Sequence, residues 1–182
     1  MQVITHPLPG LLEFQPRIFG DPRGAFFESF SARTMEGLGL PRHHWVQDNQ
    51  SVSKAGTLRG LHFQRPPHAQ AKLVRVAQGR ALDVVVDLRH RSPTFGQHAL
   101  VELTATLGNV LYVPEGFAHG FVALEDETLF LYKCSDYYAP ATEGGLRWDD
   151  PALGINWQLP GEALVSDKDA ILPTLKELDN PF

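Results

Sequence analysis

The stretch Gly108–His119, GNVLYVPEGFAH, decides the fold of this chain. Its apolar and β-branched residues predict a strand at 109–113, because such side chains suit a pleated, half-buried surface. The Pro114-Glu115-Gly116 tripeptide then predicts a turn, and a further strand is expected at 119–124. Two short strands joined by a Pro/Gly turn are typical of an antiparallel β protein.

The segments around this stretch have the same character. Further strands are expected at about 72–78, 80–88, 98–105 and 127–137, broken by Gly, Pro and Asp. Only two helices are expected, one from near Ser31 to the glycines Gly37 and Gly39, the other from near Ser166 to before Pro173. The pattern predicts an all-β sandwich or barrel with a few short helices.

Length and composition predict a single domain over residues 1–182, because no repeat or linker divides the chain. The first fifty residues are rich in turns, and we expect them to pack on, or exchange with, a partner subunit. A net charge of −5 argues against a nucleic-acid surface but still allows a nucleotide ligand. No apolar run is long enough to span a membrane. The single Cys134 cannot form an internal disulfide and the N-terminus lacks signal-peptide features, so a cytoplasmic location is expected.

The spacing of Gly108–His119 matches the second cupin motif, G-x5-P-x-G-x2-H, at every fixed position. The first cupin motif, G-x5-H-x-H-x3-E-x6-G, can be laid without a gap on Gly60, Pro66, His68, Lys72 and Gly79. Of four metal ligands, only His68 and His119 would remain. Proline has no donor atom and an ammonium repels a cation, so we expect a cupin-type jelly-roll barrel that binds no metal.

Arg59 and His62 lie three residues apart in TLRGLHFQ, residues 57–64. Odd spacing along a regular strand would place them on opposite faces. A turn at Gly60 would break this alternation and bring both side chains to one cavity. Taken alone, His62 fits a structural hydrogen bond better than a catalytic role.

The chain resembles the RmlC family of dTDP-4-dehydrorhamnose 3,5-epimerases. The resemblance covers about residues 12–169 and rests on six motifs in order: RGLHFQ (59–64), QAKLVRV (70–76), VPEGFAHGF (113–121), YKCSDYYAP (132–140), EGGLRWDDP (143–151) and SDKD (166–169). It implies a jelly-roll homodimer without metal or other cofactor. It also implies inversion of C3 and C5 of dTDP-4-dehydro-6-deoxy-D-glucose, which yields dTDP-4-dehydro-L-rhamnose for rhamnose biosynthesis.

Four catalytic residues follow from the resemblance. His62 would be the base, since an imidazole accepts a proton near neutral pH, and Asp169 would orient it. Lys72 would stabilise the enolate oxygen, and Tyr132 would donate a proton on the opposite face of the sugar. Other interpretations are open: Ser166 and Asp169 also fit a helix capping box, Lys72 a solvated charge, and Tyr132 an ordinary aromatic strand residue.

Substrate-binding candidates divide between the nucleotide and the sugar. Arginine suits a diphosphate, and an aromatic ring and amides suit thymine. Arg23 also fits an exposed type I turn, Asp21-Pro22-Arg23-Gly24, and the family implies that the N-terminal segment reaches the neighbouring subunit's pocket. His119 is expected near the sugar or in a core hydrogen bond. The candidates for the sugar are Lys72 and His119. Those for the nucleotide are Arg23, Glu28, Gln47, Asn49, Arg59, Tyr138, Glu143 and Lys168.

Three alternative functions are open. One is an epimerase acting at C3 only or C5 only of an antibiotic deoxysugar. Another is a metal-dependent cupin, against which Pro66 and Lys72 count. The third is a non-catalytic module that binds a sugar nucleotide.

Overall fold

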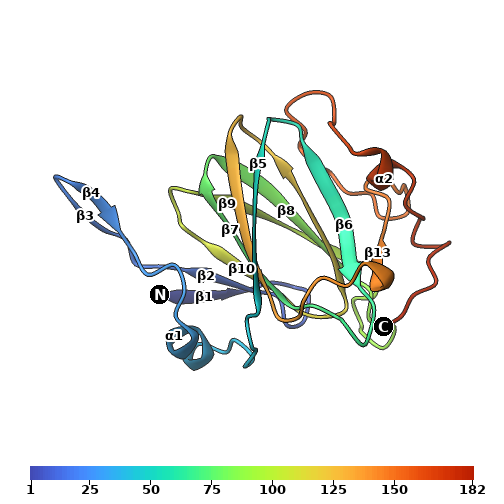
Figure 1. Cartoon of the computed structure of the whole chain (residues 1–182), viewed down its shortest axis with the longest axis horizontal. Coiled ribbons are helices and arrows are strands. Elements are labelled where there is room, and N and C mark those ends of the chain that lie inside the picture. Colours follow the sequence, from blue (N-terminus) through green and yellow to red (C-terminus); the bar gives the residue numbers. More distant parts are fainter.

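A computed structural model describes residues 1–182 as two facing antiparallel sheets with two short helices (Figure 1). The first sheet has the order β1 (Gln2–Thr5), β2 (Leu12–Gln15), β10 (Val110–Val113), β7 (Lys72–Gln78), β12 (Thr128–Cys134) and β5 (Gln47–Ser53). The second has the order β13 (Glu143–Gly145), β6 (Leu58–Gln64), β11 (Phe117–Ala123), β8 (Arg80–Asp87) and β9 (His98–Thr104). The remaining elements are the hairpin β3 (Phe19–Asp21) and β4 (Gly24–Phe26), the helices α1 (Ala32–Gly37) and α2 (Asp167–Ala170), and the 3₁₀ turn η1 (Pro140–Thr142).

The main core lies between the two sheets. Phe121 of β11 and Phe130 of β12 stack there with ring centroids 3.9 Å apart. The outer face of the second sheet is covered by the C-terminal segment through Leu146, Leu153 and Trp157. Because both of its faces are covered, β11 is buried along its whole length, which explains the nearly continuous apolar sequence at this point.

The two helices are short and capped as expected. Ser31 caps α1 and Ser166 caps α2, each accepting a hydrogen bond from the backbone N–H three residues ahead. Met35 of α1 packs with Phe14 and Tyr112 on the outer face of the first sheet. None of the helices is long and apolar enough to cross a membrane.

The prediction of an all-β chain with a few short helices is confirmed, but it missed several strands. β5, with the sequence QDNQSVS, was not among the expected strands, because its polar residues do not resemble a buried segment. Its alternate residues Gln47, Asn49 and Ser51 face a cavity, so polarity on the inner face reflects a site.

Within the N-terminal fifty residues, one part joins the sandwich and another part projects from it. β1 pairs with β2, and β2 pairs with β10, so these strands extend the chain's own first sheet. The β3–β4 hairpin instead projects away from the sandwich (Figure 1) and exposes Phe19 and Phe26, the latter by 73%.

Candidate active site

Two adjoining cavities lie at one end of the sandwich. The larger cavity, of about 470 Å³, extends between the sheets toward Phe121, Phe130 and α2. The smaller cavity, of about 210 Å³, extends toward the loop that follows β12. Four side chains line both: Asn49, His62, Lys72 and Tyr132.

His62 and Asp169 form a direct pair at the second sheet. Nε2 of His62 lies 2.7 Å from Oδ1 of Asp169, whose Oδ2 accepts the Gly60 N–H at 3.1 Å. Burial by itself would raise the pKa of Asp169, but the hydrogen bond and charge of His62, with the Gly60 N–H and Ser166, hold it below its usual value. Ser166 does cap α2 by accepting the Asp169 N–H, so the cap uses the backbone of Asp169 while its carboxylate holds the imidazole.

Gly60 places Arg59 and His62 on the same side of β6. Its φ of +130° is open to glycine, and the pairing of β6 with β11 is irregular there: Arg59 lies opposite Phe121 and His62 opposite His119. Four residues of β6 (59–62) thus lie opposite three of β11 (119–121), and the side chains of Arg59 and His62 both line the larger cavity. The predicted break at Gly60 is confirmed.

Lys72 and Tyr132 come from the first sheet, so they face His62 from the opposite wall. Lys72 begins β7 and Tyr132 lies on the neighbouring β12. Burial lowers the pKa of Lys72, although Cys134, Asp83 and Glu143 act to raise it. Burial, reinforced by Cys134, raises the pKa of Tyr132, so this phenol keeps its proton at neutral pH. A lysine amine and a phenolic donor therefore stand across the cavity from an imidazole.

The second sheet, which carries His62, holds a second acid–imidazole pair that the sequence did not indicate. His119 Nε2 is 2.8 Å from Oδ2 of the fully buried Asp83, while Asp83 Oδ1 has no hydrogen-bond partner. Burial raises the pKa of Asp83 and lowers that of His119. His119 lines the larger cavity as well, so its core hydrogen bond and a position near a ligand are compatible. A lone acid within the apolar run of β8 was the available signal for Asp83.

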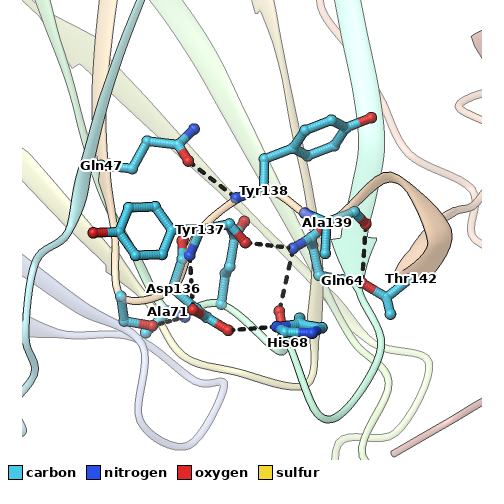
Figure 2. Close-up of polar contacts among 11 residues, drawn as sticks. Gln47, Gln64, His68, Ala71, Asp136, Tyr137, Tyr138, Ala139 and Thr142 are labelled. Carbon is cyan, nitrogen blue, oxygen red and sulfur yellow. Dashed lines mark hydrogen bonds and ion pairs between the residues drawn. The ribbon is translucent and has the colours of Figure 1, made fainter.

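Four other binding candidates line the smaller cavity, namely Gln47, Asn49, Tyr138 and Glu143, while Lys168 lines the larger one. Gln47 donates to Oδ1 of Asn49 and accepts the Tyr138 N–H at 3.0 Å, as drawn in part in Figure 2. The Tyr138 hydroxyl donates to Glu143 at 2.7 Å, and Glu143 pairs with Lys168 at 2.6 Å. Glu143 is thereby ionised: burial acts to raise its pKa, but Lys168 and Tyr138 hold it below the usual value.

Arg23 and Glu28 do not join this group within the chain. Arg23 lies at the tip of the projecting hairpin and pairs with Asp21 at 2.6 Å, and neither residue lines the two cavities. The side chain of Arg23 is 89% exposed.

The expectation that His68 keeps a barrel-ligand position beside His119 is wrong. His68 lies in the β6–β7 connection, where Nδ1 is 3.0 Å from Oδ2 of Asp136 (Figure 2). The gap-free match failed because this connection lengthens the interval between the strands. The inward-facing pair of β6, with one residue between them, is therefore His62 and Gln64. No group of three or more His, Cys, Asp and Glu side chains is placed to hold a metal ion.

The family model described as dTDP-4-dehydrorhamnose 3,5-epimerase matches residues 5–177. The chain belongs to the dTDP-4-dehydrorhamnose 3,5-epimerase family. It is 49% identical over 177 residues to the dTDP-4-dehydrorhamnose 3,5-epimerase of Salmonella typhimurium, covering 97% of each chain. The expected family resemblance is confirmed.

Solved structures place this epimerase-family chain among cupin jelly-roll proteins, as predicted. The epimerase of Legionella pneumophila, in complex with dTDP-4-keto-L-rhamnose, superposes with a TM-score of 0.94 at 43% identity, covering 98% of this chain and 94% of that one. A 3′-monoepimerase from Streptomyces bikiniensis, a histidine and tyrosine double mutant in complex with dTDP, gives a TM-score of 0.87 at 35% identity, with coverages of 97% and 87%.

Proposed function

We propose that this protein is a dTDP-4-dehydrorhamnose 3,5-epimerase, an isomerase that converts dTDP-4-dehydro-6-deoxy-D-glucose into dTDP-4-dehydro-L-rhamnose. The observation that carries the assignment of residues is the His62–Asp169 pair on one sheet, facing Lys72 and Tyr132 on the other across a shared cavity. Inversion at a carbon needs a base on one side and a proton donor on the other.

In this mechanism His62 removes the proton from a carbon next to the C4 ketone. The electron pair of the C–H bond forms a C=C bond, and the carbonyl electrons move to the C4 oxygen as an enolate. Asp169 stabilises the imidazolium that results, because its carboxylate is held 2.7 Å from Nε2 and its pKa lies below the usual value.

Lys72 offers its positive charge to the enolate oxygen, and the partly buried setting strengthens that interaction. Tyr132 then donates its hydroxyl proton to the opposite face of the carbon, which inverts it. The raised pKa of Tyr132 keeps this proton available at neutral pH. Before the second carbon reacts, Tyr132 regains a proton from solvent and His62 releases to solvent the proton that it removed. The same two proton transfers at the second carbon complete the reaction.

The substrate would lie with its sugar in the larger cavity and its thymine at the smaller one. Tyr138 offers a ring face, and Gln47 and Asn49 offer amides to the base. Arg59, Lys168 and His119 line the sugar side.

We further propose a homodimer in which the β3–β4 hairpin enters the partner's site. The support is that Ile18, Phe19 and Phe26 are exposed on this projecting arm, where apolar side chains favour burial against another surface. Arg23 and Glu28 would then serve the neighbouring pocket. A cytoplasmic location stays a prediction, supported by the lone reduced Cys134.

Single-carbon epimerisation is the second candidate, because the 3′-monoepimerase from Streptomyces bikiniensis shares this fold. The two residues replaced in that protein, a histidine and a tyrosine, are as far apart in its sequence as His62 and Tyr132 are here. The same two groups therefore fit both activities.

Exchange in deuterated water separates the candidates. The protein is incubated with dTDP-4-dehydro-6-deoxyglucose and EDTA, and C3 and C5 are followed by proton NMR and mass spectrometry. We expect deuterium at both carbons together with the L-rhamno product. Deuterium at one carbon would establish a monoepimerase, and none at either would refute the epimerase assignment.

A further inference from the structure

Tyr138 lies in a loop that is held in place by hydrogen bonds from side chains more than by backbone–backbone hydrogen bonds. After β12 ends at Cys134, residues 135–139 cross to the 3₁₀ turn beside β13. The peptide groups of Tyr137 and Tyr138 make no backbone–backbone hydrogen bond. The position of the Tyr138 ring therefore depends on which side chains bind the loop.

Gln64 binds this loop on both sides of Tyr138. Its Nε2 donates to the Tyr137 carbonyl at 3.2 Å, and its Oε1 accepts the Ala139 N–H at 3.1 Å (Figure 2). The second Nε2 hydrogen goes to the His68 carbonyl at 3.3 Å. Gln64 is only 4% exposed, so both donors and one acceptor site of its amide are committed to protein groups.

Other anchors hold only the first half of the loop. Gln70 donates to the Asp136 carbonyl at 2.7 Å, and His68 contacts the Asp136 carboxylate. Ser135 and Ala71 bond to one another. In the half that carries Tyr138, Gln47 accepts the Tyr138 N–H and Glu143 accepts the Tyr138 hydroxyl, while Gln64 binds the peptide groups on both sides of the residue.

Gln64 also links this loop to the proposed base. It lies two residues after His62 on β6, and residues so spaced point to the same face of a strand. Both line the smaller cavity, so a single strand presents the imidazole and the amide that fixes the Tyr138 loop.

We propose that Gln64 is a positioning residue for the nucleotide base: it fixes residues 137–139 so that the Tyr138 ring forms a stacking surface for the flat base of a nucleoside diphosphate. This inference rests on the proposed function, in which Tyr138 binds thymine. Gln64 acts through Tyr138 and does not touch the reacting carbons.

The test is a double-mutant cycle with dTDP as the probe, measured by calorimetry. A base–aromatic stack contributes about five- to hundredfold in affinity, so Gln64→Leu should raise the Kd for dTDP about tenfold. KM should rise similarly, while kcat at saturating substrate should change less than about threefold, because binding but not chemistry is affected. In a Tyr138→Ala background, Gln64→Leu should change the Kd by less than about twofold, since the ring that it positions is absent.

Two further variants separate positioning from a general role in folding. Gln64→Asn keeps a buried amide but is one methylene too short to reach the loop, and should weaken dTDP binding as Gln64→Leu does. Gln78→Leu makes the same replacement as Gln64→Leu at the exposed end of β7, where Gln78 makes no side-chain hydrogen bond, and should bind dTDP like the wild type. Amide hydrogen exchange in the Gln64 variants should accelerate at residues 137–139 and stay unchanged in the sheets.

Several results would overturn the inference. These are wild-type dTDP affinity in both Gln64 variants, effects of Gln64→Leu and Tyr138→Ala that multiply independently, or faster exchange throughout the barrel. Failure of the wild-type protein to bind dTDP would instead refute the proposed function, so the two failures are distinguishable.

Discussion

At the scale of single residues, each proposed role follows from a local environment. His62 is half-buried, with one ring nitrogen committed to Asp169. Lys72 makes no ion pair and sits where burial disfavours its charge. A negatively charged oxygen beside Lys72 would relieve that cost, which is the property expected of a group that stabilises an enolate.

Replacing His62 should abolish chemistry and spare binding. A general base contributes about 10²–10⁴-fold, so we expect His62→Ala to lower kcat by about 10³ while dTDP binds within about twofold of the wild type. Calorimetry and product analysis measure the two effects. His44→Ala, at an exposed histidine outside the cavities, is the control. Unaltered turnover in His62→Ala would show that His62 is not the base.

Lys72 should set the alkaline limit of activity. Burial lowers its pKa, so the ammonium that we propose to be catalytic is lost as pH rises, below the ordinary lysine value of about 10.4. We expect kcat to fall with rising pH in this range. Lys72→Arg keeps a charge at every accessible pH and should move the fall upward, whatever its absolute rate. Identical alkaline limits in kcat–pH profiles of both proteins would show that another group titrates.

At the scale of elements, β6 and β8 show how the sandwich supports its site. β6 carries Arg59, His62 and Gln64 around the irregularity at Gly60. β8 ends at the fully buried Asp87, which accepts hydrogen bonds from Arg89, Ser92 and Thr94 and so fixes the turn toward β9.

Gly60→Ala should damage both stability and activity. A Cβ at this position would lie 2.6 Å from the Cα of Gly120, and the φ of +130° is itself unfavourable for alanine. We expect about 2–4 kcal/mol less stability in denaturant unfolding and a large loss of kcat, because β6 must move from β11. Gly161→Ala meets no atom within 4 Å and should behave like the wild type. Equal stability of the two variants would contradict this account.

Asp87 should make stability depend on acid pH. Burial acts to raise its pKa, but the bonds from Arg89, Ser92 and Thr94 outweigh it and lower the pKa to about 2. A depressed folded-state pKa stabilises the protein above the ordinary value of 3.8, and this contribution is lost as pH falls toward 2.

Asp87→Asn should therefore cost about 3 kcal/mol at pH 7, since it leaves Arg89 beside a neutral group. The difference from the wild type should shrink below about pH 4 in unfolding titrations. Asp179→Asn, in an exposed ion pair with Arg65, should have little effect. A difference independent of pH would show that the charge of Asp87 is not responsible.

At the scale of the whole molecule, the proposed dimer connects the projecting hairpin with the cavity. The barrel supplies every proposed residue except Arg23 and Glu28, and these lie on or beside the arm that leaves the sandwich (Figure 1). A second subunit would bury the apolar arm and bring the missing arginine to the diphosphate.

Subunit mixing tests this arrangement. Arg23→Ala and His62→Ala should each have low activity. In a mixed dimer, one pocket would combine an intact His62 with the partner's intact arm. Random mixing should then restore about a quarter of the wild-type activity, because half of the dimers are mixed and each has one complete pocket. No recovery after verified subunit exchange would show that Arg23 does not act across the interface.

The sequence predicted much of the fold because its signals are local. Strands at 72–78, 80–87 and 110–113 follow from apolar, β-branched runs, and the caps at Ser31 and Ser166 from single side chains. β5 was missed because its inward residues are polar. His68 was misplaced because a match of spacing takes no account of a longer connection between strands.

By itself, then, the sequence determined the β architecture, the family and the identity of the chemical groups, since these depend on composition and on spacing along the chain. Only the tertiary structure decided how the groups meet. It gives the expected His62–Asp169 pair its geometry, pairs His119 with Asp83, sets Lys72 and Tyr132 on the facing sheet, and commits Gln64 to the Tyr138 loop. Hydrogen bonds between residues far apart in the sequence depend on sheet register and on the break at Gly60, and packing of the two sheets fixes both.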